Sequence, residues 1–271
     1  MMPGIEFNIM KMRIAILLIL IFPFCVSAQS SKQMLPMWWE NVASAGQTTA
    51  AWTNIPNLVS HWLMNDNLPT STVVDNKGNY VGTAQRNTSI IHTNSGNPPN
   101  LNGALYFNGT SDYVVMSGST GFNLTNVTVA GWINKPTTEY HWNLCCKNYD
   151  GIVPFLMGGL SVEGDGFHFY SSGSWKNCAY TLGRLPANQW LHLVGTYDGV
   201  NMILYVNGTQ NNKVAAEGPL PTNTQPVYIG DAFWASYMNS GMIDDVRIYS
   251  RAITSNEVVR LYNNGNGTEL E

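Results

Sequence analysis

Trp190-Leu191-His192-Leu193-Val194-Gly195-Thr196-Tyr197-Asp198-Gly199, followed by Met202-Ile203-Leu204-Tyr205-Val206-Asn207-Gly208, is the strongest strand signal in this sequence. Asp198-Gly199 and Asn207-Gly208 supply residues that tolerate a positive φ, as tight hairpin turns require. The two dipeptides flank the apolar run 202–206, which has the composition of a strand. The pattern therefore predicts a three-stranded antiparallel meander from residue 190 to about residue 215.

Sequence of the same strand-like composition continues on both sides of this meander. From Leu58 onward, short runs rich in β-branched and aromatic residues alternate with Gly, Asn and Pro, without a helical period over any long window. Val127, Val129 and Ile133 share one face of their segment, so one side of that strand packs inward. We expect an all-β fold whose clearest strands are 107–116, 127–133, 190–197, 202–206, 227–229 and 242–249.

The end of the chain carries the one strong helix signal. Thr254-Ser255-Asn256-Glu257 has the spacing of a capping box, and Val258, Val259, Leu261 and Tyr262 follow it. This pattern predicts a short C-terminal helix docked on the sheets. Residues 263–271 are rich in Gly and Asn, so we expect a flexible tail there.

The first residues have the pattern of an export signal. Lys11 and Arg13 precede the apolar run 14–26, and Val26-Ser27-Ala28 resembles a cleavage site. The run has about 13 residues, too few for a membrane-spanning helix of about 20. We therefore expect residues 1–28 to be a signal peptide and the protein to be secreted or on the cell surface. Residues 29–57, which contain Trp38-Trp39, are expected to form an N-terminal arm or linker.

Composition excludes several classes of protein. The 271 residues are 44% hydrophobic and only 11% charged, with a net charge of −4. The apolar fraction is ordinary for a folded domain, and the charged fraction is less than half of the usual value of about 25%. No basic stripe is present, so we expect no nucleic-acid partner.

Three cysteines follow the predicted cleavage site, and in an oxidising compartment one pair of them could form a disulfide. Cys145 and Cys146 are neighbours, so in a strand they point to opposite faces and only one of them can reach Cys178. We take Cys146–Cys178 as the bond to test. The alternative is three reduced, buried cysteines.

Six segments in chain order share the pattern of one known family. They are 58–65 (LVSHWLMN), 75–79 (DNKGN), 104–114 (ALYFNGTSDYV), 129–133 (VAGWI), 190–208 (the meander quoted above) and 243–253 (IDDVRIYSRAI). Together they resemble the LamG-like jelly-roll group of the concanavalin A-like lectin/glucanase superfamily, over residues 58–262. The resemblance implies a jelly-roll sandwich of two antiparallel sheets. It implies little about activity, because lectins, carbohydrate-binding modules, adhesion domains, hydrolases and lyases share this fold.

The resemblance also implies a calcium ion. Family members often hold one where the loop after the first strand meets the penultimate strand, which maps here onto Asp75, Asn79 and Asp244. Asp244 shares a face with Val246 and Ile248, so its carboxylate would be costly to bury without an ion or a counter-charge. The alternative is a carboxylate satisfied by loop N–H groups or by an arginine.

Aromatic side chains outside the family framework are candidates for a binding surface. Sugars stack on flat apolar faces and bond to nearby amides and hydroxyls. The framework residues Trp62, Trp132 and Trp190 are expected in the core. The variable segments supply the candidate ligand-binding residues, with ordinary loop packing as the alternative: Tyr140, Trp142, Trp175, Trp234 and Tyr237.

Catalytic motifs are weak in this sequence. Glu163-Gly164-Asp165 lacks the continuation of a glucanase carboxylate pattern, so we interpret Glu163 and Asp165 as solvated loop charges. His192 occupies a framework position and is expected to be structural. His168 alternates with two phenylalanines and shares a face with Tyr170, which could line a sheet surface.

These observations favour a secreted, non-catalytic binding domain that recognises carbohydrate or another extracellular ligand. The main alternative is a structural, self-assembling or adhesive surface protein that associates through its N-terminal arm. A polysaccharide lyase or glycoside hydrolase is the third possibility.

Overall fold

The computed structural model describes residues 54–66, 71–85, 101–116, 120–138, 142–149, 152–231 and 239–269. The chain divides into two compact units, Met1–Gln47 and Thr48–Glu271, and every described residue belongs to the second. The predicted signal peptide, 1–28, and the arm as far as residue 53 lie outside the described residues. Among those described, no helix is both long and apolar enough to cross a membrane.

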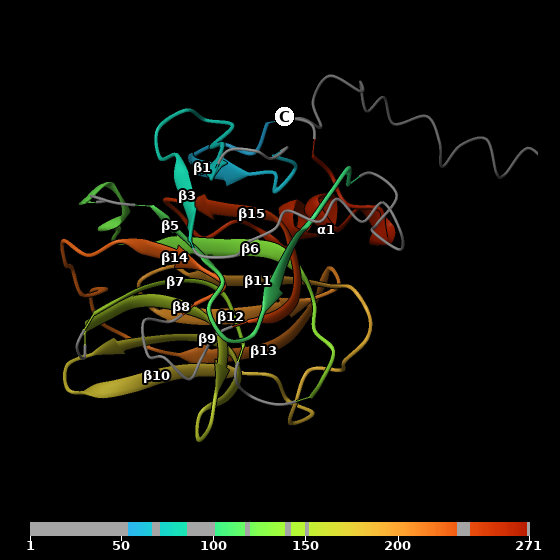
Figure 1. The fold of residues 1–271 in the computed structure, drawn as a ribbon. Coiled ribbons are helices and arrows are strands. Elements are labelled where there is room, and N and C mark those ends of the chain that lie inside the picture. Colours follow the sequence, from blue (N-terminus) through green and yellow to red (C-terminus); the bar gives the residue numbers. More distant parts are fainter. Residues whose placement is uncertain are drawn as a thin grey trace, which may run out of the picture. The chain divides into compact units, whose positions relative to one another are not determined.

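Two antiparallel sheets make up the described part of the second unit (Figure 1). The seven-stranded sheet has the order β1-β15-β6-β11-β12-β13, and β4 also pairs with β15. Its strands are β1 (Leu58–Trp62), β4 (Leu105–Asn108), β6 (Val127–Asn134), β11 (Leu191–Tyr197), β12 (Asn201–Val206), β13 (Thr209–Ala215) and β15 (Ser240–Tyr249).

The second sheet has eight strands in the order β10-β9-β8-β7-β14-β5-β3-β2. They are β2 (Thr72–Val73), β3 (Gly82–Gln85), β5 (Tyr113–Met116), β7 (Trp142–Tyr149), β8 (Ile152–Leu160), β9 (Gly164–Ser171), β10 (Ser174–Ala179) and β14 (Val227–Ile229). The helical elements are η2 (Thr120–Phe122), α1 (Ser255–Tyr262) and η3 (Asn263–Gly265). The prediction of an all-β, two-sheet sandwich with a short C-terminal helix is confirmed.

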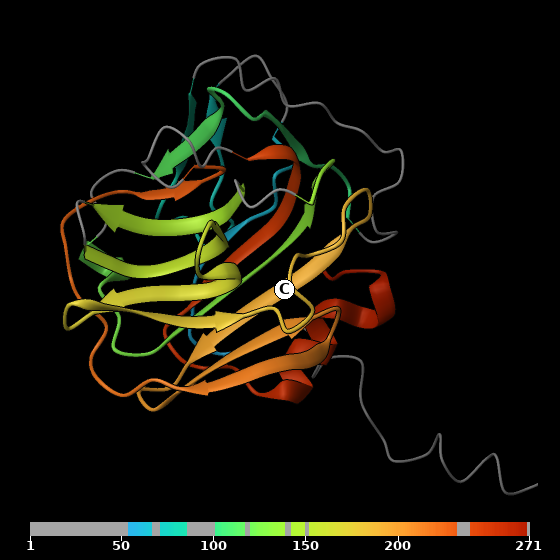
Figure 2. The same ribbon diagram turned by 90° about the horizontal axis from the view of Figure 1, so that it is seen from below.

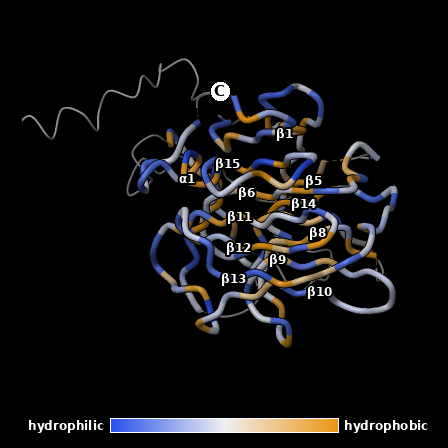
Figure 3. The backbone as a smooth tube through the Cα atoms, turned by 180° about the vertical axis from the view of Figure 1, so that it is seen from behind, coloured by the Kyte–Doolittle hydropathy of each residue, from blue (hydrophilic) through white to orange (hydrophobic). Residues whose placement is uncertain are grey.

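The predicted meander is β11, β12 and β13. β12 pairs antiparallel with both neighbours, and Gly199 and Gly208 have φ angles of 96° and 76° in the two turns. Asp198 closes the first turn, because its Oδ1 accepts hydrogen bonds from Val200 N at 2.9 Å and Asn201 N at 2.6 Å. β13 is polar and blue in Figure 3, as suits a sheet edge, whereas β8 is mostly orange.

The main core lies between the two sheets. It contains Trp62 and Phe107 from the seven-stranded sheet and Phe155, Phe167 and Phe169 from the eight-stranded sheet, all fully buried. Each of these side chains points inward because alternate residues of a strand face opposite sides.

The expectation of a core position holds for two of the three framework tryptophans. Trp62 lies in the main core, and Trp132 is 2% exposed and stacks on Tyr262. Trp190 precedes β11 and is only half-buried, so the prediction for this residue is wrong.

The C-terminal helix covers the far side of the seven-stranded sheet (Figure 2). Its capping box is formed as predicted: Glu257 N donates to Thr254 Oγ1 at 3.3 Å, and Thr254 N donates to Glu257 Oε2 at 2.7 Å. Val258 and Leu261 pack against Ala130 and other apolar side chains of the sheet. The helix therefore covers the part of this outer face around Ala130, Val194 and Tyr205.

Both ends of the predicted domain need correction. Ile55 is 4% exposed and packs in the cluster beneath the helix, so the fold begins before Leu58. The tail is not free either: Glu269 is 7% exposed and accepts hydrogen bonds from Asn102 N at 2.7 Å and Asn102 Nδ2 at 2.5 Å. Glycines allow residues 263–269 to bend back onto the sheet, which composition alone does not distinguish from fraying.

Candidate functional site

Asp75, the first residue of the predicted calcium site, is satisfied by its own loop and the first strand. Its Oδ1 accepts from His61 N at 2.9 Å and Lys77 N at 3.0 Å. Its Oδ2 accepts from Asn79 N at 3.1 Å and Tyr80 N at 2.8 Å. These four N–H groups satisfy both carboxylate oxygens with hydrogen bonds. Asn79 contributes its backbone N–H rather than its amide side chain.

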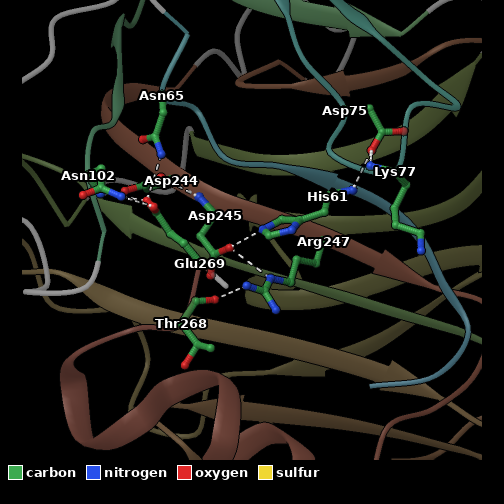
Figure 4. Close-up of polar contacts among 10 residues, drawn as sticks. All are labelled: His61, Asn65, Asp75, Lys77, Asn102, Asp244, Asp245, Arg247, Thr268 and Glu269. Carbon is green, nitrogen blue, oxygen red and sulfur yellow. Dashed lines mark hydrogen bonds and ion pairs between the residues drawn. The ribbon is translucent and has the colours of Figure 1, made fainter. Parts of the chain in front are cut away.

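Asp244 lies elsewhere, at a bulge in β15. It is fully buried, its Oδ1 accepts from Asp245 N at 2.7 Å, and its Oδ2 has no partner. Burial, together with the charges of Asp245 and Glu269, raises the pKa of Asp244 well above its usual range. In Figure 4, Asp244 and Asp75 lie on opposite sides of His61.

The predicted calcium ligands therefore do not converge, and Asp75, Asn79 and Asp244 do not fit a calcium ion as a set. Within the described residues, no group of three or more His, Cys, Asp or Glu side chains could hold a metal. We assign no role to an ion at these residues.

A buried polar network surrounds the bulge instead (Figure 4). Asp245, at a φ of 50°, accepts hydrogen bonds from Arg247 Nε at 2.9 Å and faces His61 Nε2 at 2.6 Å. Arg247 also donates to the backbone carbonyl of Thr268. The network ties the first strand, the bulge and the end of the chain together, which is a structural role.

The prediction that Asp165 is a solvated loop charge is wrong. It is fully buried rather than solvated, because it lies inside β9 on the side that faces the core. Its carboxylate accepts from Arg184 Nη1 at 3.0 Å and Leu185 N at 2.7 Å, with Lys135 Nζ at 3.4 Å. Glu163 stays in the turn and is partly exposed. Asp165 is thus bound in a structural ion pair and is not free for catalysis.

The cysteine prediction is also wrong in this structure, where Cys145, Cys146 and Cys178 are free and buried. Cys145 and Cys178 belong to the main core, whereas Cys146 points to the opposite face of the sheet. Cys146 Sγ donates to Asp231 O at 3.2 Å, and Cys178 Sγ donates to Met202 O at 3.6 Å. Strand alternation separates the pair that we selected.

We expect thiol titration of the denatured, unreduced protein to find all three thiols of residues 145–178 reactive. Burial raises the pKa of Cys178 to about 11 in the native state, so the native protein should react slowly at neutral pH. Peptide mapping after alkylation assigns the groups. Two of the three blocked by a bond would contradict the structure.

The outer face of the eight-stranded sheet, meaning the side chains that point away from the main core, has a different character. Its floor is a third buried apolar cluster, formed by Cys146, Val153, Leu156 and Leu160. The half-buried rings of Tyr170, Trp175 and Tyr228 pack against that floor. This face therefore presents aromatic rings that are partly open to solvent.

The ladder aligns one row of this outer face across five strands. Tyr228 pairs with Cys146, Cys146 with Leu156, Leu156 with His168, and His168 with Asn177. Aromatic pairs lie toward both ends of the row. Tyr170 and Trp175 meet edge to face with centroids 5.5 Å apart, and Tyr113 lies 6.0 Å from Tyr228.

Buried polar side chains lie between these aromatic pairs. His168 is fully buried, and its Nδ1 faces Asn177 Oδ1 at 3.1 Å while its Nε2 has no hydrogen-bond partner. Asn143 is 1% exposed, and its Oδ1 has no partner either. Burial lowers the pKa of His168 to about 4, so its imidazole is neutral at pH 7.

One predicted ligand-binding residue, Trp175, lies on this outer face. Trp142 does not: it is 1% exposed in the main core, so the prediction that it forms a stacking surface is wrong. It belongs to β7 and pairs with Gly159 on the inner side of β8, where the sequence suggested a loop. Tyr140, Trp234 and Tyr237 lie outside the described residues.

Sequence reasoning missed Tyr113 and Tyr228. The short strand 227–229 was predicted, and its alternation places the tyrosine opposite to the inward-facing Val227 and Ile229. Alternation along this strand therefore predicts an outward-facing Tyr228, which the set of loop aromatic residues did not include.

A shallow hollow occurs at the end of the other sheet, with a volume of about 320 Å³. Its lining residues are Tyr106, Asn134, Pro136, Asn188, Gly241 and Met242. None of them is a titratable group apart from one tyrosine, so the hollow carries little chemistry of its own.

Comparison with known proteins gives the family and the fold. A family model described as the concanavalin A-like lectin/glucanases superfamily matches residues 108–259. No curated protein sequence matches the chain.

Among solved structures, domain 4 of a GH43 extracellular arabinanase from Geobacillus stearothermophilus, in complex with arabinotriose, superposes with a TM-score of 0.58. The two are 20% identical, and the match covers 75% of this chain and 97% of that one.

Two further solved structures share the fold. The binding domain of Paraclostridial Mosquitocidal Protein 1 gives a TM-score of 0.59 at 16% identity, covering 76% of this chain and 52% of that one. Trypanosoma rangeli sialidase gives 0.53 at 17% identity, covering 80% of this chain and 34% of that one. The chain thus spans about half of the first of these proteins and a third of the second.

Proposed function

The chain belongs to the concanavalin A-like lectin/glucanases superfamily, and on that premise we propose that it is a non-catalytic domain that binds carbohydrate on the outer face of its eight-stranded sheet. The observation that carries the proposal is the row of Tyr228, His168 and Asn177 with aromatic rings at both ends. Flat rings beside amide and imidazole groups are the combination that sugar rings require.

The solved arabinanase domain supports this choice, because it shares the fold and its structure is in complex with arabinotriose. The arrangement of acidic groups favours binding over hydrolysis. A glycosidase needs two carboxylates about 5 to 10 Å apart and free to act on the sugar. Here Asp75 is held by four N–H groups and Asp165 by an arginine, a lysine and an N–H group.

We further propose that the domain works outside the cytoplasm. The apolar run 14–26 before Val26-Ser27-Ala28 supports export. A binding partner would then be an extracellular glycan, free or attached to a surface protein. Self-association through the arm 29–57 remains the alternative, and it predicts concentration-dependent assembly without affinity for sugar.

The test is a glycan array probed with the protein, followed by titration of the best oligosaccharide into single-residue variants. Trp175→Ala and Tyr228→Ala are each expected to weaken binding by about 1 to 3 kcal/mol, as for an aromatic anchor. Tyr106→Ala is the matched control, because Tyr106 is 39% exposed on the seven-stranded sheet.

Melting curves establish that the variants are folded. The proposal fails if the array shows no binding, or if Trp175→Ala and Tyr228→Ala bind as tightly as Tyr106→Ala.

A further inference from the structure

We propose that Asn264, just after the C-terminal helix, is a site of spontaneous deamidation, and that its isoaspartyl product loosens the hold of residues 263–269 on the rest of the domain. The modification goes beyond the proposed sugar binding and does not depend on it. The structure restrains the asparagines that precede glycine to very different degrees, and Asn264 is the least restrained of them.

Deamidation requires an asparagine followed by a residue whose side chain does not hinder ring closure, and glycine has none. The backbone nitrogen of the glycine attacks Cγ of the asparagine, and the new C–N bond closes a cyclic imide. The side-chain nitrogen leaves as ammonia and takes the proton of the backbone N–H. Water then opens the imide. Addition at Cγ gives aspartate, and addition at the backbone carbonyl carbon gives isoaspartate, whose main chain runs through Cγ and is one carbon longer.

Hydrogen bonds hold the side chain in three of the Asn-Gly pairs. Asn102 Nδ2 donates to a carboxylate at 2.5 Å, and the Oδ1 atoms of Asn108 and Asn207 each accept from a backbone N–H at 2.9 Å. Each of these bonds must open before the side chain can turn toward the glycine nitrogen. The chain has five such pairs, and the structure describes them all: 102–103, 108–109, 207–208, 264–265 and 266–267.

The pair 266–267 is restrained at the attacking nitrogen. Gly267 is buried, and its N–H donates to Tyr262 O at 3.2 Å. A Cβ atom on Gly267 would lie 2.8 Å from Leu101 Cδ2, so the backbone is packed against that side chain. The nitrogen that would attack Asn266 is therefore held in place.

Asn264 is exposed and lies within η3 at a φ of 53°. Its amide forms no hydrogen bond with any residue that the structure describes. A Cβ atom on Gly265 would meet only the ring of Tyr262 within 4 Å, at 3.4 Å from its hydroxyl oxygen. The Asn264 amide can therefore turn toward Gly265 without breaking a hydrogen bond of its own.

The product would disturb contacts that hold the end of the chain. Asn263 Nδ2 donates to Gly267 O at 2.9 Å, and Thr268 Oγ1 donates to Arg260 O at 3.2 Å. Both bonds span the modified residue, so an added main-chain carbon changes the spacing that they need. The new carboxylate also lies just past the carboxyl end of α1, where the helix dipole disfavours negative charge.

The experiment incubates the native protein in mildly alkaline buffer and maps deamidation by mass spectrometry, as a gain of about 1 Da at each converted asparagine. Trypsin cleavage after Arg260 isolates residues 261–271, and fragmentation then separates position 264 from 263 and 266. We expect Asn264 to convert about three- to tenfold faster than the other four pairs, the factor by which one hydrogen bond that must open slows them. In urea the five pairs should convert at similar rates, because unfolding removes the restraints.

Asn264→Gly is the matched control variant. Glycine adopts the positive φ at this position and has no amide to lose. Its melting temperature should stay constant during the incubation, whereas that of the unchanged protein should fall by about 2 to 4 °C as isoaspartate accumulates.

Faster conversion at any other Asn-Gly pair of the native protein would overturn the assignment of the site. So would an Asn264 that converts in urea but not in the native protein. If protein that is mostly isoaspartyl at position 264 melts at the same temperature as fresh protein, the loosening of residues 263–269 is overturned. None of these results bears on sugar binding at the outer face.

Discussion

Replacing Arg247 by Met is expected to lower the free energy of unfolding by about 3 to 5 kcal/mol, the usual cost of stranding a buried charge. Arg247 and Asp245 are each 1% exposed, and Arg247 Nε donates to Asp245 at 2.9 Å. Its loss leaves the Asp245 carboxylate in the core with His61 as its remaining side-chain partner. It also releases the Thr268 carbonyl and, with it, the end of the chain. Chemical denaturation measures the change.

Two control variants test whether the loss of stability in Arg247→Met comes from the broken buried ion pair. Arg251→Met breaks a pair with Glu257 that is 25% and 15% exposed, and should cost about 1 kcal/mol or less. The double variant Asp245→Asn with Arg247→Met removes both charges, and asparagine tolerates the positive φ at position 245. It should be more stable than Arg247→Met alone. Equal losses in the single and double variants would contradict the assignment of a buried ion pair.

Trp142→Ala is expected to cost about 3 to 5 kcal/mol, as for a large aromatic side chain removed from a packed core. The ring is 1% exposed between the sheets, and Lys135 Nζ lies 5.6 Å from its centroid. The change therefore leaves a cavity and also removes a contact with the Lys135 ammonium group, which is paired with Asp165.

Trp142→Phe keeps most of the volume and should lose much less stability than the alanine variant. Sugar affinity of the folded Trp142→Phe protein should equal that of the unchanged protein, since the ring does not reach the outer face. A loss of affinity without a loss of stability would restore Trp142 as a binding residue and contradict its place in the core.

The fold could be predicted because its signals are local. The dipeptides Asp198-Gly199 and Asn207-Gly208 specify two hairpins, and the capping box at Thr254 and Glu257 specifies the helix. Alternation within 127–133 also identified the inward-facing residues correctly. Each of these depends on neighbours within a few positions of the chain.

The site could be predicted only in part, because it depends on register and on contacts distant in sequence. The sequence predicts Trp142 and Asp165 to be loop residues. Strand pairing within β7 to β9 instead places both on the inner side of a sheet. A register shift between Asn143 and Cys145 also changes which residues of β7 point outward. A pattern of strict alternation assumes an unbroken strand, so it does not locate such a bulge in the sequence.

The positions of the predicted calcium ligands could not be read from the sequence for a related reason. The residues around Asp75 form a turn whose N–H groups point at its carboxylate, a geometry that residue types do not reveal. Asp244 is separated from that turn by the network of His61, Asp245 and Arg247. Satisfaction by N–H groups, the alternative raised for Asp244, describes Asp75 instead, whereas Oδ2 of Asp244 has no partner.

The most direct test of sugar binding on the outer face of the eight-stranded sheet is to map the bound oligosaccharide by NMR. The tightest ligand from the array is titrated into isotopically labelled protein, and amide shifts are followed by residue. We predict that the largest changes fall in β8, β9, β10 and β14, around Leu156, His168, Trp175 and Tyr228. Changes confined to the hollow near Tyr106 and Asn188, or to α1, would contradict the account.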